Sequence, residues 1–244
     1  MNPSLTYKTF STGLIGLLGS AGLSVAAVFQ ADLEGTTAPG SVTQAGWTSI
    51  GVENAPNPVV PSVSTTAGSV SITVTAGGAG YFQGRAGGLA TWGGITGTSW
   101  NDMVDDAVAA RNGDGTVTIS LGGLDDATEY SLTAWHNISA TDSASFANGF
   151  YAITPSIAVG TLVGVAEAGT ASNLTSNDVL TDASFDNSVI HFMPTGGSAE
   201  ILLTSASSSQ FLVLSGMQLD AVPEPASAML LGLGGLAAMC RRRR

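Results

Sequence analysis

The sequence has 244 residues, of which 10% are charged, and a formal net charge of −11 at pH 7. Residues 27–220 hold 17 of the 18 acidic residues and only two of the seven basic ones, a formal charge of −15. Such a surface repels nucleic acid, which excludes DNA or RNA as a partner, and it suits an extracellular setting with divalent cations or neutral polysaccharide. The single cysteine, Cys240, lies outside residues 27–220, so these residues have no disulfide framework.

The N-terminal residues 1–26 resemble a secretory signal peptide. Lys8 is the only charged residue before Asp32, and residues 14–28 form an apolar stretch rich in Gly, Ala, Leu and Val. Small residues up to Ala26 offer cleavage sites near the end of this stretch. We therefore expect a signal helix that is removed on export; the alternative is an uncleaved anchor helix.

Apolar and polar residues alternate along much of residues 27–220, the pattern of half-buried strands. Gly-rich turn signals separate the alternating runs. The predicted strands cover residues 29–33, 48–52, 70–75, 116–121, 130–135, 150–153, 157–165, 189–192, 200–204 and 211–219. Many short strands of this kind indicate an all-β fold, and we predict one antiparallel two-sheet sandwich over residues 27–220.

One segment departs from the alternation. Ser99 can cap a helix, with Asp102 three residues later as its acidic partner. An apolar stripe at helical spacing follows, formed by Met103, Val104, Ala107 and Val108. The sequence therefore predicts one short helix near residues 99–110. A proline-rich stretch at residues 56–61 predicts a loop.

Asp125, Asp126 and Glu129 are the candidate calcium ligands, together with backbone carbonyls. The stretch Asn112-Gly-Asp-Gly115 does not fit the spacing of an EF-hand, because Leu121 would occupy the position of the last carboxylate. It indicates a tight turn instead. No other metal or cofactor is expected, since the two histidines lie far apart with no thiol nearby.

Residues 121–135 are similar to the tyrosine corner of fibronectin type III domains and other Greek-key sandwiches. A strand ends, Leu124 turns inward, and Tyr130 opens the next strand. The resemblance implies that the Tyr130 hydroxyl bonds to the backbone upstream. The same stretch also resembles adhesive or carbohydrate-binding jelly rolls with galactose-binding-like topology, which is the topology we expect.

Trp135, His136 and Asn137 form the cluster most typical of a ligand site. They follow a predicted strand where it runs into a loop, and an aromatic face beside polar groups can stack on a sugar ring. The alternative is a tryptophan in the core beside a histidine on the surface.

Little in the sequence indicates a catalytic function. His136 and His191 have no nucleophile motif around them, and Ser215 lies outside a Gly-x-Ser-x-Gly frame. We therefore expect a non-catalytic protein. The alternative is a secreted carbohydrate-active hydrolase whose paired carboxylates meet only in the fold.

The C-terminal residues 221–244 combine three features. The box Pro223-Glu224-Pro225 is stiff and can continue neither a strand nor a helix. Residues 226–240 carry no charge, and the chain then ends on four basic residues that stop it on the cytoplasmic side of a membrane, Arg241, Arg242, Arg243 and Arg244. This order and spacing resemble the PEP-CTERM sorting signal of Gram-negative bacteria.

The resemblance implies that an exosortase, a membrane protease, recognises the box and removes the tail. Residues 226–240 would form a membrane helix of about 22 Å, shorter than the hydrocarbon core of about 30 Å, which suits transient anchoring in the inner membrane. We expect an exported protein that ends in the outer envelope or the extracellular matrix. Its expected role is structural or adhesive, with extracellular polysaccharide as the candidate partner.

Overall fold

The computed structural model describes residues 27–35, 43–52, 60–86, 106–111, 114–139, 151–174, 186–206 and 212–223. Within these ranges the chain forms strands and no helix, which confirms the all-β prediction. The strands are β1 (Ala27–Gly35), β2 (Thr48–Val52), β3 (Ser62–Ala67), β4 (Val70–Ala76), β5 (Tyr81–Ala86), β6 (Asp106–Arg111), β7 (Thr116–Gly122), β8 (Glu129–Trp135), β9 (Asn137–Ser139), β10 (Tyr151–Val159), β11 (Thr161–Leu162), β12 (Gly169–Leu174), β13 (Asn187–Met193), β14 (Ser198–Ser205), β15 (Leu212–Leu214) and β16 (Gly216–Val222).

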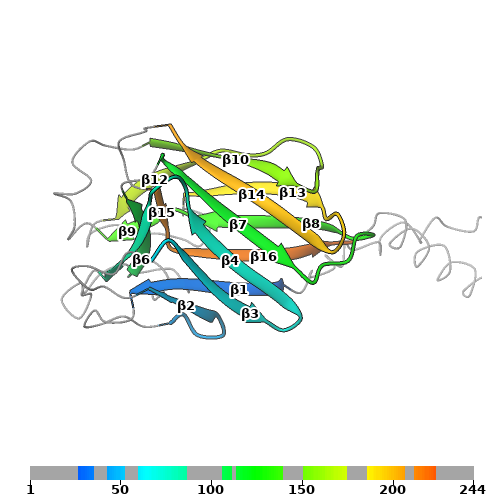
Figure 1. The fold of residues 1–244 in the computed structure, drawn as a ribbon, viewed down its shortest axis with the longest axis horizontal. Helices are drawn as coiled ribbons and strands as arrows, with labels where there is room; N and C mark the ends of the chain where they lie inside the picture. Colours follow the sequence, from blue (N-terminus) through cyan, green and yellow to red (C-terminus); the bar gives the residue numbers. More distant parts are fainter. Residues whose placement is uncertain are drawn as a thin grey trace, which may run out of the picture.

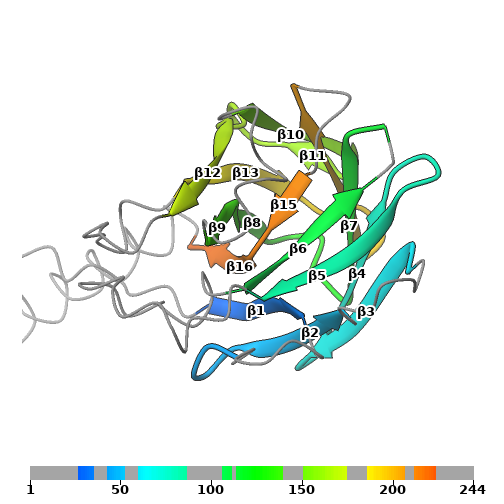
Figure 2. The same ribbon diagram turned by 90° about the vertical axis from the view of Figure 1, so that its left-hand side faces the viewer.

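Two large sheets pack as a sandwich (Figure 1). The six-stranded sheet has the order β11-β13-β8-β16-β1-β2, and the seven-stranded sheet has the order β3-β4-β7-β14-β10-β12-β9. A small sheet, β15-β6-β5, lies across one end of the sandwich (Figure 2). The sandwich prediction is confirmed, although the pairs β1–β2 and β9–β12 are parallel rather than antiparallel.

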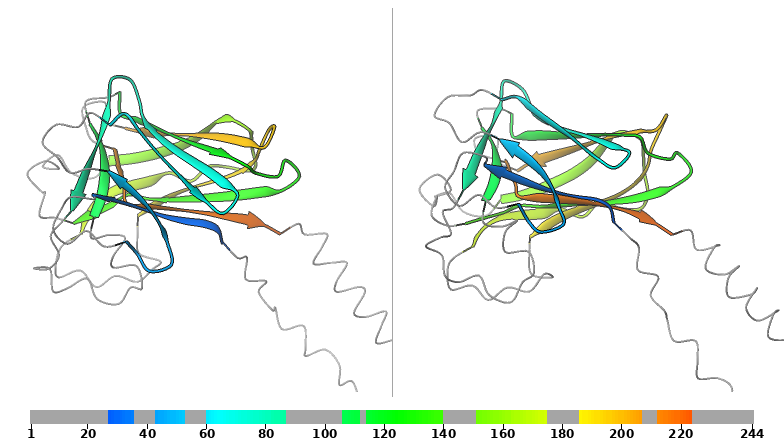
Figure 3. Two further views of the ribbon diagram at one scale, coloured as in Figure 1. Left: turned by 60° about the horizontal axis from the view of Figure 1, so that its bottom comes forward. Right: turned by 90° about the horizontal axis from the view of Figure 1, so that it is seen from below.

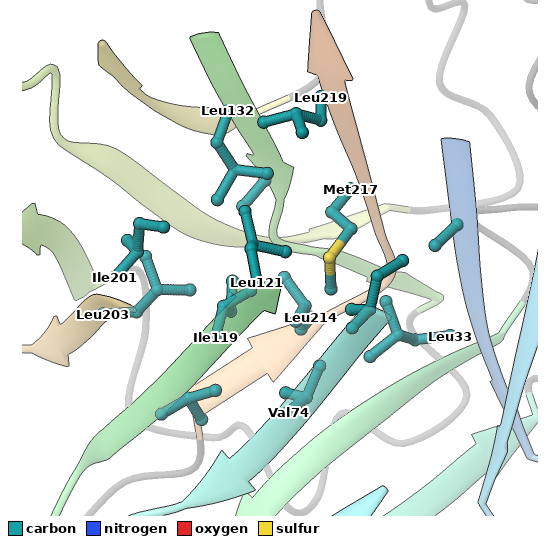
Figure 4. Close-up of a cluster of buried hydrophobic side chains, with 14 of the residues drawn as sticks. Leu33, Val74, Ile119, Leu121, Leu132, Ile201, Leu203, Leu214, Met217 and Leu219 are labelled. Carbon is teal, nitrogen blue, oxygen red and sulfur yellow. The ribbon is translucent and has the colours of Figure 1, made fainter. Parts of the chain in front are cut away.

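The core lies between the two large sheets, and strict alternation builds it. In β4, β7 and β14 each buried residue is followed by one that is exposed or half-buried. Figure 4 shows the resulting cluster, in which Leu33, Ile119, Leu132 and Leu203 are among the fully buried side chains. Each such side chain contributes about 1.5–3 kcal/mol through removal from water, so the alternation that predicted the strands also stabilises their packing.

The predicted helix near residues 99–110 is wrong where the structure describes it. Asp106–Arg111 is strand β6, which pairs with β5 through Phe82 and Ala110 and with β15 through Leu212 and Ala110. The backbone bonds of β6 are made to strands far away in sequence, and such tertiary pairing overrides a local helical pattern. Residues 99–105 lie outside the described residues.

Other differences concern strand boundaries. The predicted strand at residues 211–219 is divided at Ser215, whose backbone N–H donates to the Trp135 carbonyl and whose carbonyl accepts from Leu33 N–H. The strands before and after it, β15 and β16, therefore join different sheets. The sequence did not predict β3, β5, β9 and β12, because these Ser-, Thr-, Gly- and Asn-containing segments lack clear apolar alternation.

The two chain ends of the sandwich lie side by side. Ala27, the first residue of β1, is paired with Asp220 near the end of β16, and Figure 3 shows that β1 begins at the end of the sandwich where β16 ends. The predicted signal helix at residues 1–26 and the predicted membrane helix at residues 226–240 lie outside the described residues. Within the described part, no helix has the length and apolar character needed to cross a membrane.

Candidate functional site

The outer face of the six-stranded sheet carries a chain of side-chain amides. Gln30 on β1 donates through Nε2 to Oε1 of Gln218 on β16 at 2.8 Å. Gln218 in turn donates through Nε2 to both carboxylate oxygens of Asp220, at 2.9 and 2.8 Å. All three side chains are half-buried, on the side of the sheet opposite the core residues Ala31 and Leu219. The arrangement offers fixed, mostly uncharged hydrogen-bonding groups to solvent.

Two acidic side chains of β1 on this same face are buried. Asp32 is fully buried and accepts a 2.6 Å hydrogen bond from the backbone N–H of Gln44. Glu34 is also buried and accepts hydrogen bonds from the hydroxyls of Thr43 (2.9 Å) and Ser49. Buried carboxylates that accept such bonds are positioned by the fold rather than open to a substrate. They therefore give no support to a hydrolase with paired carboxylates across an open cleft.

Trp135 is covered by a second tryptophan. Its side chain is 4% exposed, and Trp47 lies against it with ring centroids 5.6 Å apart and planes tilted by 53°. Across the sheet, Trp135 is paired with Gly216, and Gly216 is paired with Asp32. The aromatic ring predicted to stack on a sugar is thus inside the molecule, whereas Trp47, which remains half-buried, is the outer ring of the pair.

His136 is fully buried and bonded through both ring nitrogens. Nδ1 lies 2.9 Å from the Val213 carbonyl oxygen, and Nε2 lies 2.9 Å from Oγ of Ser188. Because a carbonyl only accepts, Nδ1 carries the hydrogen and Nε2 accepts from the Ser188 hydroxyl. Burial lowers the pKa of His136 to about 4, against the hydrogen bond to Val213, which acts to raise it. The imidazole is therefore neutral at pH 7.

A serine hydroxyl donating to a neutral imidazole is also the minimal arrangement for nucleophilic catalysis. Here Ser188 is only 1% exposed, so its hydroxyl links β13 to the residue after β8 instead of facing solvent. Asn137, the third member of the predicted cluster, lies in β9, and its side chain is outside the described part. The cluster Trp135-His136-Asn137 thus places two of its three side chains in the interior.

The three candidate calcium ligands each contact a different part of the protein. Asp125 accepts from Ala127 N–H at 3.0 Å, and Asp126 accepts from the backbone N–H groups of Gly196 and Gly197 at 3.0 and 2.7 Å. Glu129 lies 3.4 Å from Nδ1 of His191. Within the described ranges, no three His, Cys, Asp or Glu side chains form a group that could hold a metal ion. The two aspartates instead brace the turns that precede β8 and β14.

Tyr130 forms the corner that the sequence predicted. Its hydroxyl accepts a 3.1 Å hydrogen bond from the backbone N–H of Asp125, five residues upstream. Its ring is buried and stacks on Phe192, with centroids 6.0 Å apart. The tyrosine corner is therefore confirmed, and Tyr130 has a structural role.

The seven-stranded sheet presents a surface that sequence reasoning missed, which we call the hydroxyl face. On five of its strands every second residue points away from the core and is exposed or half-buried, and most of these residues are Ser or Thr. Its hydroxyl-bearing residues are Ser62, Ser64 and Thr66 on β3, Ser71, Thr73 and Thr75 on β4, Thr116, Thr118 and Ser120 on β7, Ser198 and Thr204 on β14, and Thr154 and Ser156 on β10. The signal was present in the Val-Ser-Ile-Thr-Val-Thr and Thr-Val-Thr-Ile-Ser-Leu runs, where polar positions hold only hydroxyl residues.

Comparison with known proteins identifies one segment. Residues 221–244 match the family model of the PEP-CTERM protein-sorting motif, which confirms the sorting signal predicted at the C-terminus. The match contains the Pro223-Glu224-Pro225 box and the four terminal arginines, of which Pro223 lies in the described part. Neither the curated proteins nor the solved structures contained a match to the chain. The galactose-binding-like topology therefore stays a prediction.

The motif has direct consequences for the route of the protein. It implies export, transient anchoring in a membrane, processing by an exosortase and a destination at the cell surface or outside the cell. Because β16 ends at Val222 and the box begins at Pro223, the motif joins the sandwich without a linker.

Proposed function

We propose that the exported protein is a non-catalytic structural or adhesive component of the cell envelope or extracellular matrix and that it contacts neutral polysaccharide. The observation that carries the proposal is a contrast between the interior and the two outer faces. Asp32, Ser188 and His136 are buried and hydrogen-bonded within the fold. The outer faces present hydroxyls on one sheet and an amide chain on the other.

The outer faces are chemically suited to polyols. Hydroxyl and amide groups both donate and accept hydrogen bonds, as sugar hydroxyls do, and their desolvation costs less than that of a charged group. The negative charge of the body disfavours anionic partners at long range. Sorting to the surface brings these faces to where extracellular polysaccharide occurs.

A glycan array tests this function directly. The protein is recovered from the exporting host in its processed form and applied with and without calcium. We expect retention on neutral glycans, no release of sugar, and no dependence on calcium. Release of reducing ends would instead support the hydrolase alternative, and retention on no glycan at all would refute the contact with polysaccharide.

A further inference from the structure

We propose that the hydroxyl face of the seven-stranded sheet is the surface on which the protein adsorbs an extended, neutral polysaccharide. This inference rests on the proposed contact with polysaccharide and assigns that contact to one face. In Figure 1 the strands β3, β4, β7 and β14, which carry most of this face, run side by side across the front of the molecule.

Strand register arranges the hydroxyls in rows. Ser64 on β3 is paired with Thr73 on β4, which is paired with Ser120 on β7. The next row joins Ser62, Thr75 and Thr118 in the same way, and it continues through Leu202 to Ser156. In a regular sheet, neighbours in a row are about 4.8 Å apart and successive rows about 6.8 Å apart. The face is thus a repeating lattice of hydroxyls rather than a single pocket.

Bonds between neighbouring hydroxyls hold parts of this lattice in place. Oγ of Ser64 and Oγ1 of Thr73 are 2.9 Å apart, and Oγ1 of Thr75 donates to Oγ of Ser62 at 3.2 Å. A hydroxyl has one donor and two acceptor positions, so each bonded pair keeps further acceptor capacity and one hydrogen free for a ligand. Short Ser and Thr side chains also lose little rotamer freedom on binding.

The face is nearly free of charge in a strongly acidic protein. Glu200 is the one charged residue in the strands of this sheet as the structure describes them. The outer face of the other large sheet carries two half-buried carboxylates, Glu129 and Asp220, besides the buried Asp32 and Glu34. A neutral chain can lie on the hydroxyl face without removing water from carboxylates, whereas a polyanion meets the repulsion of the whole body. The charge distribution therefore favours a neutral occupant.

The lattice favours a polymer over a single sugar. One exchange of water for a sugar hydroxyl gains little, because the net contribution of each hydrogen bond is small. A chain that crosses several rows makes many such contacts together, and later contacts form at high effective concentration. Retention should therefore rise steeply with glycan length, and free monosaccharide should not compete.

Removing three central hydroxyls tests the assignment. In the exported, processed protein, the variant T73V/T75V/T118V keeps side-chain shape and strand preference but loses the hydroxyls. We expect its dissociation constant on cellulose to rise at least about tenfold, given the loss of several small contacts. The same exchange at Thr133, half-buried on β8 of the opposite sheet, is the matched control and should change the constant less than about twofold.

A second variant controls for stronger binding caused by the added apolar surface of the valines. Thr118→Glu places a carboxylate in the middle of the face and should also weaken adsorption to cellulose, whereas Thr133→Glu should not. Circular dichroism and the denaturant midpoint of each variant establish that it is folded. Alginate, a polyanion, serves as the comparison polymer, and we expect weaker retention on it than on cellulose.

The outcomes separate this inference from the proposed function. If the protein binds a neutral glycan and the triple valine variant binds it equally well, the face is wrong while the contact with polysaccharide stands. If sedimentation shows a dimer that the triple variant abolishes and cellulose is not bound, the face joins two copies of this chain and the glycan assignment is overturned. Equal or stronger binding to alginate would also overturn it.

Discussion

Ala27 and Asp220 lie opposite each other on β1 and β16, so β1 begins and β16 ends at the same end of the sandwich. Ala27 directly follows the predicted signal peptide in the sequence, and the sorting box directly follows Val222. The start of β1 and the end of β16 thus lie at one end of the body (Figure 3).

The sorting box can be tested by alanine substitution. In the variant P223A/E224A/P225A we expect the precursor to stay in the inner membrane, because the stiff kink that marks the processing site is gone. Cell fractionation and mass spectrometry should then detect peptides from residues 226–244, which the processed wild-type protein lacks. Pro61→Ala, an exchange at an exposed proline outside the box, is the control and should be released normally. Normal release of the triple variant would mean that the box is not read.

The absence of a linker predicts a steric effect on processing. Val222 is paired with Glu129 on β8, so the last residue before the box is held in the sheet. A flexible Gly-Ser insertion between Val222 and Pro223 should therefore speed conversion of precursor to mature protein, because the enzyme no longer has to approach a folded edge. Pulse-chase labelling measures this rate.

The control for this experiment places the same insertion at Gly68, in the turn between β3 and β4, where φ is 61°. It should leave the rate of conversion unchanged. An insertion before Pro223 that leaves the rate unaltered, or slows it, would show that the folded edge is no obstacle.

Loss of the tyrosine corner should destabilise the sandwich. Tyr130→Phe removes the oxygen that accepts the hydrogen bond from Asp125 N–H and leaves the stacked ring in place. We expect the free energy of unfolding to fall by about 1 kcal/mol, the typical net value of one hydrogen bond. Urea denaturation measures it, and an unchanged midpoint would show that the bond contributes nothing to stability.

The sequence predicted the strands that are buried on one face and solvated on the other. Residues 48–52 agree with β2 at both ends, and β4, β7, β8 and β14 each contain the predicted range. In these strands apolar residues recur at every second position, and this spacing places all of them on the face that packs into the core. The tyrosine corner could also be predicted from the sequence, because Asp125 and Tyr130 lie close together in the chain.

What the sequence did not reveal depends on distant partners. β6 is a strand because β5 and β15 flank it, and no local pattern carries that information. Trp135 is covered because Trp47 reaches it from a segment far away in the chain. The hydroxyl face is likewise assembled from strands that are neighbours in the sheet but distant in the chain, because β7 pairs with β4 on one side and with β14 on the other.

The buried imidazole of His136 predicts how stability depends on pH. Its pKa is lowered from 6.5 to about 4, mainly because burial disfavours the charged form. In the unfolded chain the group titrates near its ordinary value, so between about pH 6.5 and pH 4 the unfolded state binds more protons than the folded state. The free energy of unfolding should therefore fall through this window as pH decreases, by about 3 kcal/mol from this group. Below pH 4 this contribution becomes constant, and above pH 6.5 it vanishes.

Urea denaturation at closely spaced pH values separates this contribution from that of the carboxylates. His136→Gln removes the titrating group, so its stability should change less between pH 6.5 and pH 4 than that of the wild-type protein. Thr133→Val, which removes no titrating group, is the control and should keep the wild-type slope. What decides the matter is the difference in slope and not the absolute stability, because replacing a buried side chain costs stability at every pH. Equal slopes for the wild-type protein and His136→Gln would show that the imidazole is not held neutral by the fold.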